Sequence, residues 1–260
     1  MIMDKDKILR TENLTMGYGK RMLLQDVSVT VSRGSLVALI GRNGAGKSTL
    51  LRTLVGLVNP LSGKVFVDNK PLSKFEPTLR AKKVAFVAAG GRMSIPGMTV
   101  RDIVSLGRAP YTDWIGRLNS DDKLIVDEAI QSVGLQGFAD REYDSLSDGE
   151  AQRVNIARAL AQQTAFMLLD EPTSFLDLPA RYDLCMTLRR LAHERNVGVL
   201  FSIHDLDIAL QFADQLLIVE GSGLACGTPD ALIEDGVFSR IFDSDHLVFD
   251  TALRRLRPRQ

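Results

Sequence analysis

The sequence lacks the features that mark secreted and membrane-spanning proteins. Cys185 and Cys226 are its only two cysteines, which is too few for a disulfide framework and favours a reducing interior. No apolar run approaches the ~20 residues that span a bilayer. The apolar runs are strand-sized, and the run at residues 197–203 is broken by Gly198 and Ser202. The opening MIMDKDKILR has no apolar stretch typical of a secretory signal. We therefore expect a soluble intracellular protein.

The sequence also lacks an excess of charge of either sign. Lys and Arg together number 32, and so do Asp and Glu, which makes the formal net charge zero. Neutralising the phosphates of a nucleic acid requires a basic surplus, so free nucleic acid is not the expected partner. The 260 residues allow one elaborate domain or two modest ones, either of which can bury a substantial core.

The order of apolar segments indicates an α/β protein. Short strands are predicted at residues 8–14 and 27–31, joined through Gly17-Tyr18-Gly19, and a continuous apolar run follows at residues 35–40. Later strand-like and helical segments alternate, which is typical of a mainly parallel sheet buried on both faces. The predicted strands lie at residues 84–88, 166–169, 197–203 and 216–219, and the predicted helices include residues 48–57, 180–193 and 205–214.

The segment at residues 99–163 interrupts this alternation because it is helical throughout and contains no good strand. We therefore predict a single domain with two appended parts. Its core spans about residues 1–96 and 164–235, an inserted helical lobe about 97–163, and a C-terminal extension about 236–260. The early strands are expected to form a separate antiparallel layer.

A phosphate-binding loop is the strongest motif in the chain. The pattern G-x-x-x-x-G-K-[ST] is matched after a buried strand and at the start of a helix, by Gly41-Arg42-Asn43-Gly44-Ala45-Gly46-Lys47-Ser48, with Thr49 following. Glycines let successive N–H groups point at phosphate oxygens, the lysine adds a point charge, and the serine hydroxyl ligates Mg²⁺. The helix that begins at about Lys47 adds its N-terminal dipole. This segment predicts a nucleoside triphosphate site rather than an ordinary glycine-rich turn.

Two acidic residues follow a second buried strand. Residues 166–169 are apolar and lead directly into Asp170 and Glu171. The carboxyl end of a parallel strand faces the ligand crevice, so Asp170 is placed to hold Mg²⁺ through water. Glu171 is placed to act as general base for an attacking water. A core strand that ends in solvated acids is the alternative, and the phosphate-binding loop favours the functional reading.

A third motif indicates the family. Leu146-Ser147-Asp148-Gly149-Glu150-Ala151-Gln152-Arg153 precedes a helix, and Ser147 with Glu150 also fits a helix capping box. The whole string resembles the signature motif of ATP-binding cassette (ABC) proteins. Other marks of that family follow in order: Tyr18 resembles the aromatic that stacks on adenine, Ser174-Phe175-Leu176-Asp177 the loop at the dimer interface, and His204 the switch histidine.

The resemblance implies a P-loop NTPase (RecA-like) core and an ATPase whose two copies close head-to-tail around two ATP molecules. It implies that Lys47 and Ser48 bind phosphate and magnesium, that Asp170 helps hold magnesium, and that Glu171 polarises the water. His204 would sense the γ-phosphate, although a lone histidine after a strand is more often a core residue. Tyr18 has the alternative of a plain surface aromatic.

The signature residues would act across the dimer. Ser147, Gly149 and Glu150 would then cap the γ-phosphate held by the other copy, because they form a second helix N-terminus able to face a phosphate. Asp148 stands where a glycine is more usual, and a carboxylate near a γ-phosphate would repel it. We expect the Asp148 side chain to point away from ATP.

A further segment narrows the resemblance. Leu106-Gly107-Arg108-Ala109-Pro110-Tyr111, followed by Trp114, resembles cassettes that drive import of iron chelates, haem and cobalamin. An amphipathic helix followed by a proline-containing loop is the alternative. The resemblance implies a peripheral subunit at the cytoplasmic face of the membrane, with separate permease subunits and a substrate-binding protein upstream.

Two other classes of function remain open. A soluble cassette protein acting on ribosomes, nucleic acid or cofactor assembly is one, but ribosome-acting members generally carry two cassettes and this chain has one phosphate-binding loop. A GTPase or phosphoryl-transfer enzyme is the other, but it leaves the signature string unexplained and no N-K-x-D motif is present. The ABC importer motor is therefore the leading prediction.

One departure from the family pattern generates a test. Cassettes usually carry a glutamine after the strand at residues 84–87, where it touches magnesium and lies near the membrane subunit, but Ala89 occupies that position. An alanine cannot ligate a cation, so either water or a nearby polar group such as Ser94 takes this role, or coupling is looser. We expect Ala89→Gln to change the ATPase rate and its magnesium dependence. If both stay unchanged in a steady-state ATPase assay, the alanine at this position causes no loss of activity or of magnesium dependence.

Overall fold

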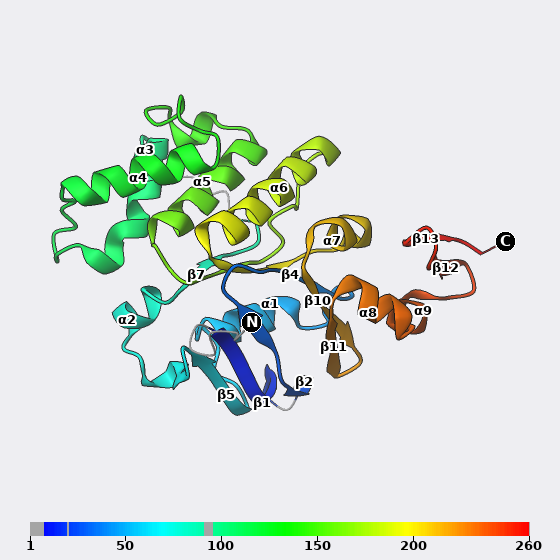
Figure 1. Ribbon diagram of the computed structural model, residues 1–260. Helices are drawn as coiled ribbons and strands as arrows, with labels where there is room; N and C mark the ends of the chain where they lie inside the picture. Colours follow the sequence, from blue (N-terminus) through cyan, green and yellow to red (C-terminus); the bar gives the residue numbers. More distant parts are fainter. Residues whose placement is uncertain (1–7, 20, 91–95, 260) are drawn as a thin grey trace.

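The centre of the molecule is a six-stranded sheet with the strand order β11-β10-β4-β9-β8-β7 (Figure 1). The computed structural model describes residues 8–19, 21–90 and 96–259. The strands from β10 to β7 run parallel, and β11 pairs antiparallel with β10 at one edge. The strands are β4 (Leu36–Ile40), β7 (Val84–Val87), β8 (Phe166–Leu169), β9 (Gly198–Ser202), β10 (Gln215–Glu220) and β11 (Gly223–Gly227).

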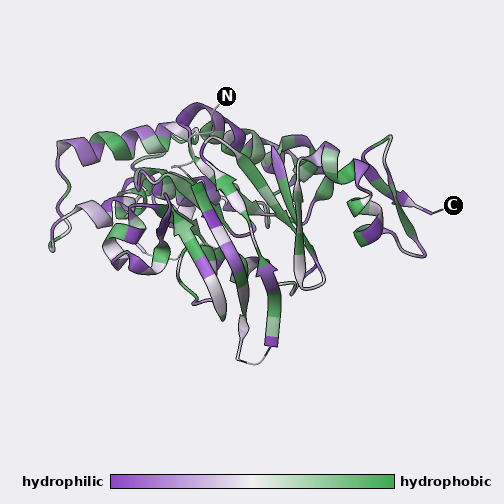
Figure 2. Ribbon diagram, turned by 60° about the horizontal axis from the view of Figure 1, so that its bottom comes forward, coloured by the Kyte–Doolittle hydropathy of each residue, from purple (hydrophilic) through white to green (hydrophobic). Residues whose placement is uncertain are grey.

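The sheet is buried on both faces, as its continuous apolar runs predicted. All five residues of β4 are buried. Because side chains alternate across a strand, Ala38 and Ile40 join a core under the helices, whereas Val37 and Leu39 join a second core on the opposite face. Figure 2 shows these hydrophobic strands lying inside the molecule. Both cores hold the ends of the parallel strands in place, where the functional residues begin.

A second, antiparallel sheet covers one face, together with helix α1 (Lys47–Leu54). It contains β1 (Ile8–Tyr18), β2 (Arg21–Val27), β3 (Thr30–Ser32), β5 (Ser62–Val67) and β6 (Lys70–Pro71). The predicted antiparallel layer is confirmed, but its strand limits were wrong. Gly17 and Tyr18 lie inside β1 rather than in a linker, and residues 27–31 are split between two strands. β-Bulges in β1 shift its register past residue 14, so apolar alternation did not reveal the extension.

Helices cover the other face of the central sheet, and three of them form a lobe, seen in green at the top of Figure 1. The lobe helices are α3 (Val100–Ser105), α4 (Ser120–Ser132) and α5 (Asp148–Ala161). The remaining helices are α2 (Pro77–Ala81), α6 (Leu178–Arg195), α7 (Leu206–Phe212), α8 (Pro229–Glu234) and α9 (Val237–Phe242). We keep the division into core, helical lobe and C-terminal extension as a proposal. In the described part of the chain, no helix is long and apolar enough to cross a bilayer.

A buried ion pair gives the Leu106–Tyr111 segment a structural role in the helical lobe. Arg108 and Asp122 are 5% and 3% exposed, and the Arg108 Nε donates to Asp122 Oδ1 at 2.8 Å. Arg108 also donates to the Ala161 carbonyl at the end of α5. A Cβ on Gly107 would lie 2.1 Å from the Arg158 carbonyl oxygen, so only glycine fits there. The segment therefore joins α3, α4 and α5 into one lobe.

The C-terminal extension ends in a hairpin of β12 (Leu247–Asp250) and β13 (Arg255–Pro258), at the right of Figure 1. It packs on α9 through Phe249, whose ring stacks on that of Phe238 with the ring centroids 4.7 Å apart. Three arginines of this region form ion pairs within the chain: Arg254 with Asp230, Arg257 with Asp250 and Arg259 with Asp243. The positive charges of these three arginines are thus balanced by acidic side chains of the same chain.

The lobe ion pair gives a test of stability and of its pH dependence. Burial opposes ionisation of Asp122, but hydrogen bonds from Arg108 and Asn119 hold its pKa below the usual range. We expect Asp122→Asn to lower the free energy of unfolding by about 3 kcal/mol at pH 7, because it leaves Arg108 buried without its counter-charge. Urea denaturation measures this, and Asp127→Asn, which breaks the exposed pair with Arg101, should cost less than about 1 kcal/mol.

The sign of the pH effect follows from the lowered pKa. A carboxylate whose pKa is depressed by folding contributes stability above its unfolded pKa of about 3.9, and loses it as the pH falls through the folded pKa. The difference between wild type and Asp122→Asn should therefore be equal at pH 7 and pH 5 and shrink below about pH 4. A difference that has already vanished at pH 5 would contradict an ionised, paired Asp122.

Candidate active site

The phosphate-binding loop connects β4 to α1 at the carboxyl end of the sheet. Gly44 and Gly46 have φ angles of +75° and +99°, in the left-handed region that favours glycine. A Cβ on Gly46 would also press on Leu23 at 3.2 Å. The first-turn N–H groups of a helix have no intrahelical acceptor, and no side chain caps those of α1. The loop therefore presents backbone donors to an anion, as predicted from the glycine spacing.

Lys47 is folded back onto the loop. Its side chain is buried, and its Nζ donates to the carbonyl oxygens of Gly41 at 2.8 Å and Arg42 at 3.2 Å. Burial lowers the pKa of Lys47, and the charges of Glu171 and Asp170 oppose this shift. These bonds hold the ammonium group beside the anion-binding N–H groups of the loop.

A cavity of about 310 Å³ opens beside the loop. Tyr18, at the end of β1, is 54% exposed at its rim, and its hydroxyl lies 3.2 Å from Thr49 Oγ1. Most of the other lining residues belong to the predicted site: Asn43, Gly44, Gly46, Lys47, Ser48, Thr49 and Glu171. Arg21 and Leu23 of β2 also line it. The sequence did not indicate these two because the strand that carries them was not predicted.

Asp170 lies at the end of β8, 1% exposed. Its Oδ1 accepts hydrogen bonds from the hydroxyls of Ser48 at 3.0 Å and Ser202 at 2.9 Å. Its Oδ2 is buried and has no hydrogen-bond partner among the described residues. Because Ser48 gives its one proton to Asp170, the lone pairs of its hydroxyl remain available. A partnerless carboxylate oxygen and a hydroxyl oxygen are hard ligands that suit Mg²⁺.

Glu171 projects from a strained backbone position toward the loop. Its φ is +47°, which is uncommon for a non-glycine residue and concentrates at functional sites. Its Oε1 lies 2.8 Å from His204 Nε2, and its Oε2 accepts from Ser174 at 3.1 Å. Burial opposes ionisation, but the hydrogen bond and charge of His204, followed by Ser174, hold the pKa of Glu171 below its usual range. The carboxylate is thus held ionised at the cavity.

The signature residues lie apart from this cavity. Ser147 caps α5, and its Oγ accepts the Glu150 N–H at 3.3 Å while Glu150 Oε2 accepts the Ser147 N–H at 2.8 Å. The capping box is therefore formed. None of Ser147, Gly149 and Glu150 lines the cavity at the phosphate-binding loop. Within one chain, these three residues lie outside the cavity that contains the phosphate-binding loop.

The two departures from the family pattern lie near each other. Ala89 is exposed just after β7, and its neighbour Gly90 lines a cavity of about 180 Å³ together with Asp148 and Glu171. Ser94, the polar group suggested as a replacement, lies outside the described residues. The expected direction of Asp148 relative to ATP stays a prediction, because that ATP would be held by another copy.

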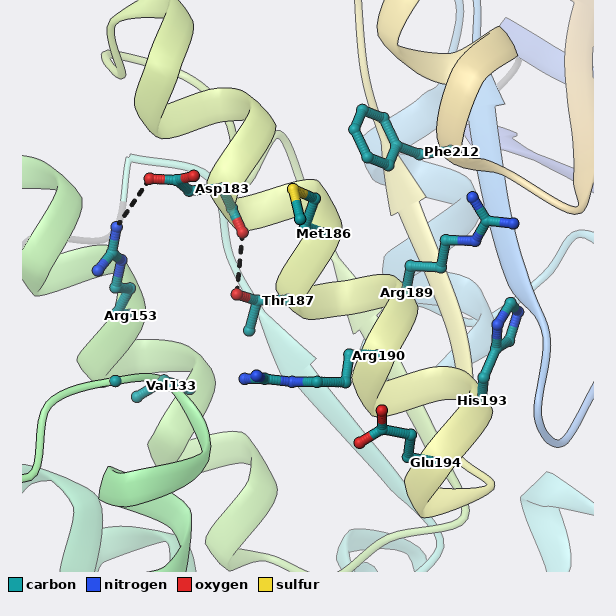
Figure 3. Close-up of a pocket in the computed structure, with 11 residues that line it drawn as sticks. Val133, Arg153, Asp183, Met186, Thr187, Arg189, Arg190, His193, Glu194 and Phe212 are labelled. Atoms are coloured by element: carbon teal, nitrogen blue, oxygen red, sulfur yellow. Dashed lines mark hydrogen bonds and ion pairs between the residues drawn. The ribbon is translucent and has the colours of Figure 1, made fainter.

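A larger cavity lies elsewhere. A groove of about 720 Å³ runs along α6, with Val133 and Arg153 of the helical lobe on its far side (Figure 3). In Figure 3, Arg153 is directed at Asp183, and its Nη2 lies 3.9 Å from Asp183 Oδ2. The Thr187 hydroxyl donates to the Asp183 backbone carbonyl. The groove contains neither the phosphate-binding loop nor the paired acids, so size does not identify the active site.

Comparison with known proteins gives one consistent family. The family described as ABC transporter matches residues 24–174, more than half of the chain. The chain is 38% identical to the iron(3+)-hydroxamate import ATP-binding protein of Bacillus subtilis, over 86% of each protein. It is 36% identical to the ferric enterobactin transport ATP-binding protein of Escherichia coli, over 93% of this chain and 89% of that protein.

Solved structures agree with the sequence relatives. A metal-chelate-type ABC transporter in an inward-facing conformation superposes with a TM-score of 0.79 at 30% identity, over 91% of this chain and 89% of that one. A bacterial ABC transporter cassette solved as a dimer superposes with a TM-score of 0.73 at 26% identity, over 85% of this chain and 98% of that one. The predicted fold class is therefore confirmed.

The role expected of Tyr18 is tested by separating its ring from its hydroxyl. Removing an aromatic that stacks on a base costs about 1–3 kcal/mol, so Tyr18→Ala should weaken ATP binding roughly 5- to 150-fold. Tyr18→Phe keeps the ring and loses only the Thr49 contact, so it should change the Kd less than about threefold. Fluorescence titration with a labelled ATP analogue measures both. Equal losses in the two variants would assign the effect to the hydroxyl and not to stacking.

Proposed function

Because this chain belongs to the ABC transporter family of ATP-hydrolysing proteins, we propose that it is the motor subunit of an importer for a metal chelate. The observation that supports ATP hydrolysis is the position of the Glu171 carboxylate, which lines the nucleotide cavity with its Oε1 2.8 Å from His204 Nε2. The relatives named above support import of a metal chelate, since their names describe iron(3+)-hydroxamate import and ferric enterobactin transport.

The chemistry assigns a role to each site residue. The loop N–H groups and Lys47 bind the β- and γ-phosphates, and Tyr18 stacks on the adenine. Ser48 and Asp170 would hold Mg²⁺, which would neutralise charge that develops on the phosphates. Glu171 accepts a proton from the attacking water, and its lowered pKa keeps it in the base form at neutral pH. His204 orients that carboxylate and responds to the γ-phosphate.

A second copy of the chain completes the site. Ser147, Gly149 and Glu150 do not line the cavity at the phosphate-binding loop of their own chain, which supports their action on the ATP of the partner copy. Phe175, directly after Ser174, is 80% exposed. An exposed large aromatic on the loop that follows the catalytic acid fits a surface that becomes covered in a dimer. The cassette solved as a dimer supports the same arrangement.

The remaining subunits lie outside this chain. We propose separate permease subunits that hold it at the cytoplasmic face of the membrane, and a substrate-binding protein that delivers an iron–siderophore, haem or cobalamin-type cargo. A soluble cassette acting on a cytoplasmic assembly is the alternative, and neither the relatives nor the balanced charge favours it. Nucleic acid is not a proposed partner, because the chain has no basic surplus.

Capture of the partners tests this proposal. Tagged Glu171→Gln is added with ATP and magnesium to detergent-solubilised native membranes and recovered by affinity pull-down. Removing the base should block hydrolysis and trap the closed dimer with its permease, because binding of ATP is left intact. We expect a polytopic membrane protein in near-equal amount by mass spectrometry.

The control is Glu171→Gln combined with Lys47→Ala, which removes the phosphate-binding charge and should recover no ATP-dependent dimer. Ribosomal or soluble assembly proteins in place of a membrane protein would keep the ATPase and overturn the importer proposal.

A further inference from the structure

We propose that Ser202 is a positioning residue for ATP hydrolysis, because its single hydroxyl joins the two acids of the site. Its Oγ donates to Asp170 Oδ1 at 2.9 Å and accepts the backbone N–H of Glu171 at 2.7 Å. The inference rests on the roles proposed above for Asp170 and Glu171, and it adds a residue that the sequence motifs do not contain.

The location of Ser202 follows from the strand order. Strand β9 lies between β4, which leads into the phosphate-binding loop, and β8, which leads into the acids. Ser202 is the last residue of β9 and pairs with Leu39 of β4, while Phe201 pairs with Leu169 of β8. The side chain of Ser202 therefore reaches Asp170 and Glu171, the two residues that directly follow β8.

Burial makes both hydrogen bonds of Ser202 necessary. The residue is 0% exposed and interrupts an otherwise apolar strand. A buried hydroxyl without partners is unfavourable, and a hydroxyl has one proton to donate. The Glu171 N–H can only donate, so Ser202 accepts from it and gives its one proton to Asp170. The direction of both bonds is therefore fixed, and they hold the Asp170 carboxylate and the Glu171 backbone.

The first bond orients the Asp170 carboxylate. Ser48 and Ser202 both donate to Oδ1, and the buried Oδ2 has no partner among the described residues. The two donors thus hold one oxygen and leave the other to a cation. Without Ser202, Ser48 remains the one hydroxyl donor to this carboxylate, and rotation of the carboxylate becomes easier.

The second bond holds the backbone of Glu171. Its φ of +47° is a conformation that non-glycine residues keep only where the surroundings enforce it. This turn directs the Glu171 side chain toward His204 and Ser174. Loss of the Ser202 hydroxyl leaves the Glu171 N–H without this acceptor and permits the backbone to relax, which moves the base away from its place at the cavity.

Steady-state kinetics distinguish positioning from packing. Losing a hydrogen bond to a charged group corresponds to roughly a tenfold rate effect or more, so Ser202→Ala should lower kcat at least about tenfold. The KM for ATP should stay within about threefold, and the Mg²⁺ concentration for half-maximal rate should rise at least about threefold. Ser202→Thr retains the hydroxyl and should keep kcat within about threefold of wild type.

The matched control is Ser35→Ala, which removes a hydroxyl bonded to the Ser32 carbonyl at 2.7 Å, just before β4 and far from the acids. It should lower Tm, by less than Ser202→Ala because Ser35 is only partly buried, and it should leave kcat unchanged. If Ser202→Ala loses Tm but retains wild-type kcat and Mg²⁺ dependence, the hydroxyl only packs and the inference is overturned.

A double mutant separates this inference from the proposed function. In a Glu171→Gln background, which binds ATP without hydrolysing it, Ser202→Ala should still raise the Mg²⁺ concentration needed for ATP-dependent dimer formation, because this effect goes through the bond to Asp170. An unchanged Mg²⁺ requirement in that background would overturn the inference. If Glu171→Gln alone hydrolyses ATP at the wild-type rate, the proposed role of Glu171 fails instead.

Discussion

The site depends on the hydrogen bonds that two hydroxyl groups donate to the buried Asp170 carboxylate. Its Oδ1 accepts from Ser48 on α1 and from Ser202 on β9, and it lies at the end of β8. One acidic group thus connects the phosphate-binding helix with two neighbouring strands. Because the group is almost fully buried, these bonds are strong and an unpaired oxygen is costly. The buried Oδ2 without a hydrogen-bond partner among the described residues supports the proposed cation site at this carboxylate.

The surrounding fold keeps this cluster rigid. Two apolar cores on opposite faces of the sheet fix the strands that end in Ile40, Leu169 and Ser202. The helical lobe is held together by its own buried pair, Arg108 with Asp122. Ser147, Gly149 and Glu150 do not line the cavity at the phosphate-binding loop, whereas Asp148 lines a smaller cavity together with Glu171. This arrangement suits the proposed site that a second copy completes.

Sequence reasoning succeeded where a motif has one geometric solution. The glycine spacing, Lys47 and Ser48 required a tight loop before a helix, and α1 begins at Lys47. It failed where pairing between distant segments decided the outcome. The extension of β1 through Tyr18 depends on bulges against β2, and β5 acquires its place by pairing with β1. Ser147 illustrates a third case, since a capping box and a phosphate-binding helix start use the same residues, and a single chain forms only the first.

The sequence by itself determined the phosphate-binding loop, the acids and the α/β class, because each rests on local spacing or on apolar periodicity. Its ordered motifs also carry the resemblance that indicated the family. The tertiary structure alone decided that Ser202 touches both acids, that His204 meets Glu171, and that Arg21 and Leu23 line the cavity. Those contacts join residues on different strands and depend on strand order and register. Strand order is set by how the whole chain buries its apolar faces, which local sequence patterns do not encode.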